Sequence, residues 1–344
     1  MYAAEKSPDN ENKKHYETLP IMRIIPLKTF SLFTLVFSYL PLQAWSWGFF
    51  AHKKINRYAI TTLPKGMFCF YKKNLVFLTE KSVAPDNRRY VLEGEAEKHF
   101  IDLELYDLNL INDPVISLDQ AIELYGAQQV IEHGQLPWAI IKVHKQLTKA
   151  FMHKNIAQIL KLSADLGHYI ADAHVPLHTT QNYNGQMTEQ EGIHALWETR
   201  LPTLFFDKYN LFVGQASYIN DPLTHIWKII RQSHTLVNKV LDLEKQISEQ
   251  SAAITKYSFE QEGNLTKKQY SFEFSTAYHE ALEGQVEERL KESIIQTGNF
   301  WLTAWIDAGC PNLDDCTITV SIEDEDDKLM KQAVALKGVR TCND

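Results

Sequence analysis

Residues Leu162–Pro202 read LSADLGHYIADAHVPLHTTQNYNGQMTEQEGIHALWETRLP, and the interpretation of the chain starts from this stretch. Apolar residues recur at spacings of three and four, which predicts a helix over Ile156–Ala173. His168 and Asp172 are four residues apart, so they lie on one face of that helix, one turn apart. A single pair of this kind is more often a solvated helix face than a ligand pair.

The second half of the stretch adds three more donors. Pro176 disfavours helical geometry at the residue before it, so the helix bends or ends there and His178 can turn toward the same cavity. After an Asn-Gly loop, His194 and Glu198 form a second pair four residues apart on a new helix. Helical bundles build polynuclear metal sites in this way, and imidazole and carboxylate donors together suit Zn²⁺. Without a cation, burial of these groups would cost roughly several kcal/mol per uncompensated charge.

The composition excludes several classes of protein. With 44% hydrophobic residues, 14 Gly and 12 Pro among 344 residues, the chain is too apolar for disorder or a fibre. Its 35 basic and 43 acidic residues give a net charge of −8, so there is no general basic surface for duplex nucleic acid. Four Cys in a chain of this length do not make a disulfide scaffold, and their pairing is not readable from the sequence.

Helical spacing recurs along most of the chain. Besides the helix named above, it appears at Ala51–Leu63, Leu118–Glu132, Trp138–Ala150, Pro222–Ile247 and Ser275–Ile306, the last as one helix or two. Strand alternation appears only at Thr317–Ile322. We therefore predict an all-α fold, a single globular helical domain over residues 47–313. For the C-terminal tail at 314–344 the pattern leaves the structure undetermined.

The N-terminal region has the three parts of a secretory signal peptide at residues 22–46. These are a basic flank, an apolar run from Phe30 to Leu40, and the small-x-small cleavage site Ala44-Trp45-Ser46. The run is shorter than the roughly 20 apolar residues that span a membrane. Cleavage after Ser46 makes Trp47 the mature N-terminus, and the expected location is secreted or periplasmic. Residues 1–21 are polar and are consistent with an extension upstream of the true start.

Two further segments offer donors of the same kind. His99 lies in an apolar stretch thirteen residues after Asp86, and His52 lies five residues after Trp47. An α-amino group has an unperturbed pKa near 8, so a new N-terminus at Trp47 loses its proton to a metal at little cost.

In these motifs the chain resembles the zinc-dependent phospholipases C and the single-strand-specific zinc nucleases of fungi and plants, which share one helical fold. The resemblance is carried, in chain order, by Trp47 with His52, Asp86 with His99, His168-x-x-x-Asp172-x-His174-x-Pro-Leu-His178, and His194-x-x-x-Glu198. It implies three zinc ions per chain. The implied ligands of the first ion are Asp86, His99, His168 and Asp172; those of the second are His178, His194 and Glu198; those of the third are the Trp47 amine and carbonyl, His52 and the bridging Asp172. It also implies that Asp86 accepts a proton during catalysis.

The resemblance does not point to a single substrate, because some features are similar to the nucleases and others to the phospholipases. The short spacing from Trp47 to His52 is similar to the nucleases, whereas Glu198 and the compact loop between His178 and His194 are similar to the phospholipases. We therefore slightly favour a secreted zinc-dependent phosphodiester hydrolase of the phospholipase C kind, which acts on phospholipid head groups with transient contact to a membrane surface. The alternative is a single-strand-specific endonuclease that cleaves DNA or RNA. An alternative of another class is a non-catalytic secreted zinc-binding helical protein, and no stable protein partner is predicted.

For several residues near the motifs the sequence allows two roles. Phe49, Phe50, Phe100 and Tyr183 suit either the stacking of bases or contact with a lipid interface. We expect His174 to hydrogen-bond a metal ligand. Asp165 lies one turn before His168, and either supports a ligand or is a solvated carboxylate.

Overall fold

The computed structural model describes residues 48–106, 115–250, 255–262 and 265–313. Among them helices dominate, and the predicted all-α fold class is confirmed. The signal peptide, Trp47, the tail at 314–344 and the predicted strand at 317–322 lie outside the described residues. None of the described helices has the length and apolar content needed to cross a lipid bilayer.

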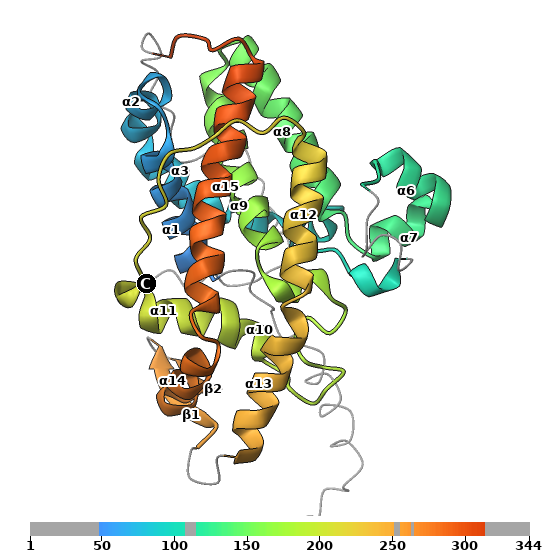
Figure 1. The fold of residues 1–344 in the computed structure, drawn as a ribbon, viewed down its shortest axis with the longest axis vertical. Helices are drawn as coiled ribbons and strands as arrows, with labels where there is room; N and C mark the ends of the chain where they lie inside the picture. The colour runs from blue at the N-terminus through green and yellow to red at the C-terminus, as the bar shows by residue number, and fades with distance from the viewer. Residues whose placement is uncertain (1–47, 107–114, 251–254, 263–264, 314–344) are drawn as a thin grey trace, which may run out of the picture. The chain divides into compact units, whose positions relative to one another are not determined.

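The helices follow one another along the chain as Figure 1 shows. The N-terminal group consists of short helices: α1 (Phe49–Ala59), η1 (Ile60–Thr62), α2 (Lys65–Lys73), α3 (Leu75–Glu80), η2 (Lys81–Val83), α4 (Ala84–Arg88), η3 (Ala96–His99) and η4 (Leu103–Leu105). The middle of the chain forms α6 (Leu118–Tyr125), α7 (Ala127–Glu132), α8 (Leu136–Met152), α9 (Ile156–Ala173), η5 (Pro176–Thr179), α10 (Ile193–Ala195), η6 (Leu196–Arg200), α11 (Leu201–Phe205) and η7 (Phe206–Lys208). The C-terminal group is α12 (Pro222–His234), α13 (Val237–Gln250), α14 (Phe272–Ala281) and α15 (Gln285–Asp307).

The predicted helices are present, but the segments 118–132, 222–247 and 275–306 each contain two α-helices, which was one of the two alternatives for the last segment. The helix predicted at 156–173 is α9, with the same bounds. The segment 118–132 divides at Gly126 and gives α6 and α7. The φ angle of Gly126 is 85°, a left-handed backbone conformation that glycine adopts more readily than other residues. The segment 275–306 becomes α14 and α15, which meet at Gly284, where φ is 82°. Apolar spacing continues across such breaks, so periodicity alone does not locate them.

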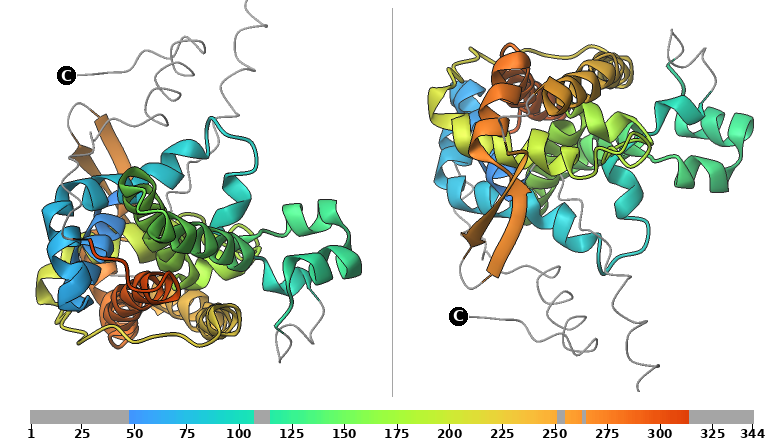
Figure 2. Two further views of the ribbon diagram at one scale, coloured as in Figure 1. Left: turned by 90° about the horizontal axis from the view of Figure 1, so that it is seen from above. Right: turned by 90° about the horizontal axis from the view of Figure 1, so that it is seen from below.

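Helix α9 is the central element of the bundle. It packs against α8, α15 and α1, and against the turn η2. Figure 1 shows α9 behind α15 and α12, and in Figure 2 α6 and α7 project away from this group of helices. Every residue of α9 from Ser163 to Ala173 is buried. The polar side chains on this part of the helix therefore need partners inside the protein.

Two apolar clusters meet at α9. One joins the α8, α12 and α15 side chains around Trp138, Trp227 and Trp301, and the other surrounds Trp197 and Phe274. Trp197 and Trp301 are completely buried and belong to the core. Helix α9 contributes side chains to both clusters and also carries two of the candidate ligands, His168 and Asp172.

One hairpin was not predicted. Strands β1 (Tyr257–Glu262) and β2 (Leu265–Tyr270) pair antiparallel, with Tyr257 opposite Tyr270. The sequence signal is Gly263-Asn264 between two runs rich in strand-forming residues, a pattern typical of a two-residue hairpin turn. Mixed charges at Glu260, Lys267 and Lys268 obscure the alternation.

Candidate metal centre

Four residues from three separate segments meet at one face of α9. His168 and Asp172 project from α9, Asp86 from α4, and His99 from the end of η3. All four residues are at most 5% exposed. The structure therefore brings together the residues implied as ligands of the first zinc ion, which the sequence separates by up to 86 positions.

The donor atoms of this first group are close to one another. The His99 Nδ1 atom lies 2.9 Å from Asp172 Oδ2, 3.1 Å from His168 Nε2 and 3.8 Å from Asp86 Oδ1. The His168 Nε2 atom lies 3.3 Å from Asp172 Oδ2 and 3.7 Å from Asp86 Oδ1. Tetrahedral zinc with bonds of about 2.0–2.1 Å separates its ligand atoms by about 3.3 Å. The group has the spacing of such a site.

His52 extends the group from α1. Its Nε2 atom lies 3.4 Å from Asp172 Oδ1, and its ring stacks on that of His168 with 3.9 Å between centroids. The other Asp172 oxygen, Oδ2, faces His99 and His168. The two oxygens of one carboxylate thus face two sets of donors, which is the arrangement of a bridging ligand. Trp47, the remaining predicted ligand on this side, lies outside the described residues.

The second group is separate. His178 follows the end of α9 in η5, and His194 and Glu198 come from α10 and η6. The Nε2 atoms of His178 and His194 lie 3.4 Å and 3.0 Å from Glu198 Oε2. The sequence predicted one regular helix here, but η6 is a π-helical turn, a feature frequent at functional sites.

This second group also tests whether a metal fits. The Nε2 atoms of His178 and His194 and both Glu198 oxygens are buried, and none forms a hydrogen bond to the described residues. Such atoms are costly in a protein interior. A cation between the three side chains would give each of them a partner. Two nitrogen donors and a carboxylate, with no thiolate, match the donor set of zinc.

Backbone carbonyls orient three of the imidazoles. The Nδ1–H of His168 donates to the Ser82 carbonyl over 2.8 Å, that of His194 donates to Tyr183 over 3.0 Å, and that of His178 donates to His99. In His178 and His194 the Nε2 atom keeps its lone pair and faces Glu198. Burial lowers the pKa of His168, but Asp172 and Asp86 outweigh it and raise the pKa to about 9, so in the absence of a cation this ring is largely protonated at neutral pH. Metal-binding histidines are usually held by a hydrogen bond of this kind, because it sets both the tautomer and the ring orientation.

Burial and charge keep most of these groups in the form that binds a cation. Burial, reinforced by His168, lowers the pKa of His52 to about 3. Burial also lowers the pKa of His99 to about 3 and that of His194 to about 4, so these imidazoles are neutral at pH 7. Burial raises the pKa of Asp172, but His168 and His178 outweigh it and hold the pKa well below the usual range. Burial raises the pKa of Glu198 to about 8, so in the absence of a cation this carboxyl is largely protonated at neutral pH.

A cavity opens beside both groups. Its volume is about 440 Å³, and His99, His178 and His194 form part of its wall. The remaining wall includes Arg89, Phe100, Asp102 and Tyr183. These three candidate metal ligands are thus in contact with a space that is large enough for a small organic group, and they are not sealed in the core.

Sequence reasoning missed Arg89. Its Nη1 atom lies 3.7 Å from Asp86 Oδ1, and its side chain is 23% exposed at the cavity. Arg89 lines the cavity, and its side chain can contact an anion that lies beside the candidate ligands. The signal in the sequence is weak: Arg89 lies three residues after Asp86, so it shares a helical face with that carboxylate.

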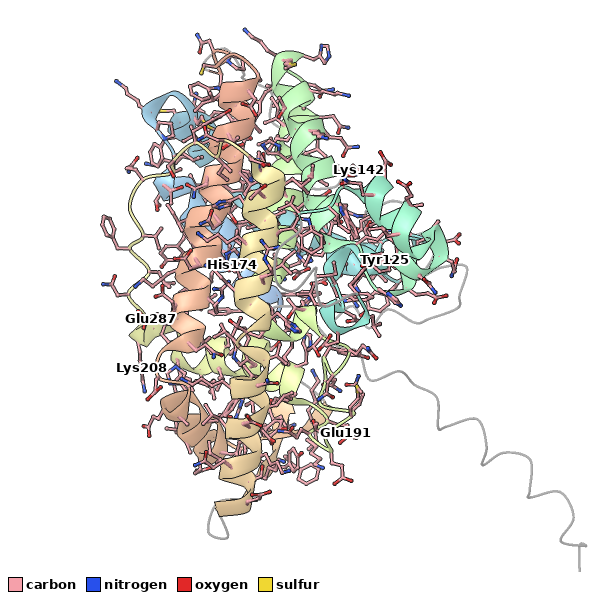
Figure 3. The ribbon with its side chains drawn as sticks, turned by 45° about the vertical axis from the view of Figure 1, so that its right-hand side comes forward. Tyr125, Lys142, His174, Glu191, Lys208 and Glu287 are labelled. Carbon is pink, nitrogen blue, oxygen red and sulfur yellow. The ribbon has the colours of Figure 1, made fainter. Side chains whose placement is uncertain are left out.

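The structure corrects the expectation for His174 and decides between the two interpretations of Asp165. His174 does not hydrogen-bond a candidate ligand in the described structure: its Nδ1–H donates to the Ile170 carbonyl within α9. Figure 3 shows His174 between α12 and α15, and the Arg289 side chain donates to its carbonyl. Asp165 is not solvated: it is 5% exposed and pairs with Arg88. Cys69 and Cys310 are exposed and form no disulfide among the described residues.

Neither a protein-family model nor a curated protein sequence matches this chain. Among solved structures, the chain is similar to the alpha toxin from Clostridium absonum, with 14% sequence identity and a TM-score of 0.42. The similarity covers 74% of this chain and 63% of the toxin chain, so this chain spans less than two thirds of the toxin's length. At this level the similarity carries no argument about activity, which rests on the site residues alone.

Proposed function

We propose that this chain is a secreted zinc-dependent hydrolase of phosphodiesters. The observation that supports the proposal most strongly is the set of buried donor groups described above: Asp86, His99, His168 and Asp172, with His52 beside them, and His178 with His194 and Glu198. Bound Zn²⁺ supplies hydroxide near neutral pH by lowering the pKa of coordinated water, and it offsets the negative charge of a phosphate group.

The chain's own residues then have distinct tasks. Arg89 binds a non-bridging phosphate oxygen, because a guanidinium at the cavity wall donates to anions in a fixed, planar geometry. Asp86 accepts a proton during catalysis, as the family resemblance implies. The backbone carbonyls of Ser82, His99 and Tyr183 hold three imidazole rings in orientation before substrate arrives.

The cavity favours a phospholipid over a nucleic acid. Phe100, Leu105 and Leu177 make much of its wall apolar. Leu105 and Tyr183 are 38% and 44% exposed, and so present apolar surface at the cavity. A lipid surface favours an apolar rim, whereas single-stranded nucleic acid favours a basic groove. In the described residues the cavity wall contains one arginine and no lysine, and it includes the carboxylates of Asp102 and Glu132.

One experiment compares the substrates directly. The chain that begins at Trp47 is loaded with zinc and given phosphatidylcholine vesicles, single-stranded DNA and RNA in parallel, with a chelator-treated sample as the control. Release of a phosphorylated head group, dependent on zinc, supports the phospholipase. Cleavage of nucleic acid without lipid cleavage would establish the nuclease alternative in its place.

The same experiment tests the third class. A protein that binds zinc and cleaves none of the three substrates is better described as a zinc-binding helical protein. A protein that binds no zinc would refute the proposal as a whole. Arg89→Ala is the matched variant here, because Arg89 contacts substrate in the proposal but contributes no metal-binding atom. It should keep the zinc content of the parent and lose activity.

A further inference from the structure

A buried ion network lies beneath the first donor group. The Arg88 guanidinium is 6% exposed at the end of α4, and it contacts two carboxylates from other segments. Its Nη1 and Nη2 atoms lie 3.1 Å and 3.0 Å from the two oxygens of Asp165 on α9. Its Nε and Nη2 atoms lie 3.2 Å and 3.1 Å from Glu95 Oε1.

Tyr169 closes the network toward the histidines. Its hydroxyl donates to Glu95, and its ring lies edge-on to His99 and His168, with centroids 5.4 Å and 5.6 Å apart. Lys98 adds a charge at the second Glu95 oxygen. Burial alone would raise the pKa of Glu95, but Arg88, followed by Lys98 and Tyr169, lowers it to about 2. The carboxylate is therefore ionised throughout the physiological range.

The network and the donor group use the same three segments. Arg88 lies two residues after Asp86 on α4, Glu95 lies four residues before His99, and Asp165 lies one helical turn before His168. Each segment thus contributes at least one residue to the network and at least one donor to the first group. The described network includes no residue of the segments that carry His178, His194 and Glu198.

We propose that Arg88, Glu95 and Asp165 are positioning residues that hold the first donor group in metal-binding geometry, while the second group forms without them. The inference rests on the proposed metal centre. A bidentate guanidinium fixes both the distance and the orientation of two carboxylates, which a lysine cannot do. Loss of outer-shell partners of this kind weakens metal binding by about 10- to 100-fold.

The test uses Glu95→Gln and a matched control, Glu244→Gln. Glu244 is also fully buried, and it contacts a tyrosine, Tyr270, and a lysine, Lys256, but it is distant from the network in the described contacts. Zinc affinity is measured by titration against a chromophoric chelator, and the number of sites is measured by elemental analysis. We expect Glu95→Gln to weaken zinc binding about 10- to 100-fold at the first group only, with one tight site retained.

The outcomes separate this inference from the proposed function. Glu244→Gln should lower thermal stability without changing zinc affinity. Arg88→Lys, which keeps the charge, is the second variant if Glu95→Gln fails to fold, and the same selective loss is expected. Parental affinity in both network variants, or equal loss at all sites, would overturn the positioning role while the proposed function stands. A parent chain that binds no zinc would instead remove the proposed function.

Discussion

Asp172→Asn is the substitution that most directly tests the arrangement of the metal centre. The two Asp172 oxygens face different donors, His52 on one side and His99 with His168 on the other. Asparagine keeps the shape but removes the charge and replaces one oxygen with an amide that cannot bind a cation. Two metal positions are therefore weakened at once, because one loses its donor atom and the other keeps only a neutral carbonyl oxygen. The group of His178, His194 and Glu198 keeps all its donors.

The expected magnitude follows from binding linkage. When free zinc is at about 100 times the dissociation constant, each occupied site stabilises the folded state by about 2.7 kcal/mol. Loss of two sites removes about 5 kcal/mol. For a domain somewhat above 200 residues, 1 kcal/mol corresponds to roughly 2–4 °C in Tm. The zinc-dependent rise in Tm should therefore be smaller by roughly 10–20 °C in the variant, and activity should be lost.

The assay combines elemental analysis with thermal unfolding, with and without zinc. The parent is expected to bind three zinc ions and Asp172→Asn about one. Glu198→Gln is the reciprocal variant and should lose one ion. Asp307→Asn makes the same chemical change at an exposed carboxylate on α15 that bonds to Tyr218, and it should keep all three. Retention of two or more ions by Asp172→Asn, or activity with a single ion lost, would refute the bridging role.

Three further predictions concern other parts of the site. Gly167→Ala would place a Cβ atom 2.0 Å from Asn56 Oδ1 and push α1, which carries His52, away from α9. We expect a loss of about 1–3 kcal/mol in unfolding free energy and a weaker zinc site at His52. The control Gly66→Ala meets only the Trp305 side chain, at 3.3 Å, and should bind zinc as the parent does. Arg89→Ala should lower kcat/KM about 10- to 100-fold, the equivalent of one charged hydrogen bond, at unchanged zinc content; unchanged kcat/KM would exclude contact with the phosphate. The pKa of Glu95 is about 2, well below its usual value, so the stabilising effect of this carboxylate is present above about pH 4.5 and is lost as the pH falls toward 2. In the presence of a chelator, Glu95→Gln should therefore be less stable than the parent by about 2–3 kcal/mol at pH 7 and equally stable below pH 2. A stability difference that stays constant across that pH range would contradict the assignment.

Local periodicity predicted the helices well where one face is consistently apolar. Helix α9 has the bounds that its spacing indicates, because a capping Asn155 precedes it and Pro176 prevents its continuation. Breaks inside apolar segments were not located, as at Gly126, because the apolar pattern continues through the turn. The hairpin at β1 and β2 was missed, since charged side chains interrupt its alternation.

The sequence by itself determined which residue types are available for metal binding and which pairs share a helical face. His168 with Asp172 and His194 with Glu198 follow from a spacing of four residues, since the helical repeat is a local property of the backbone. Only the tertiary structure decided that His99 approaches Asp172, that His178 approaches Glu198, and that Arg88 is buried between Asp165 and Glu95. These contacts join different helices and turns, separated by 7 to 77 residues in the chain. They depend on how side chains pack between those elements, which periodicity does not encode.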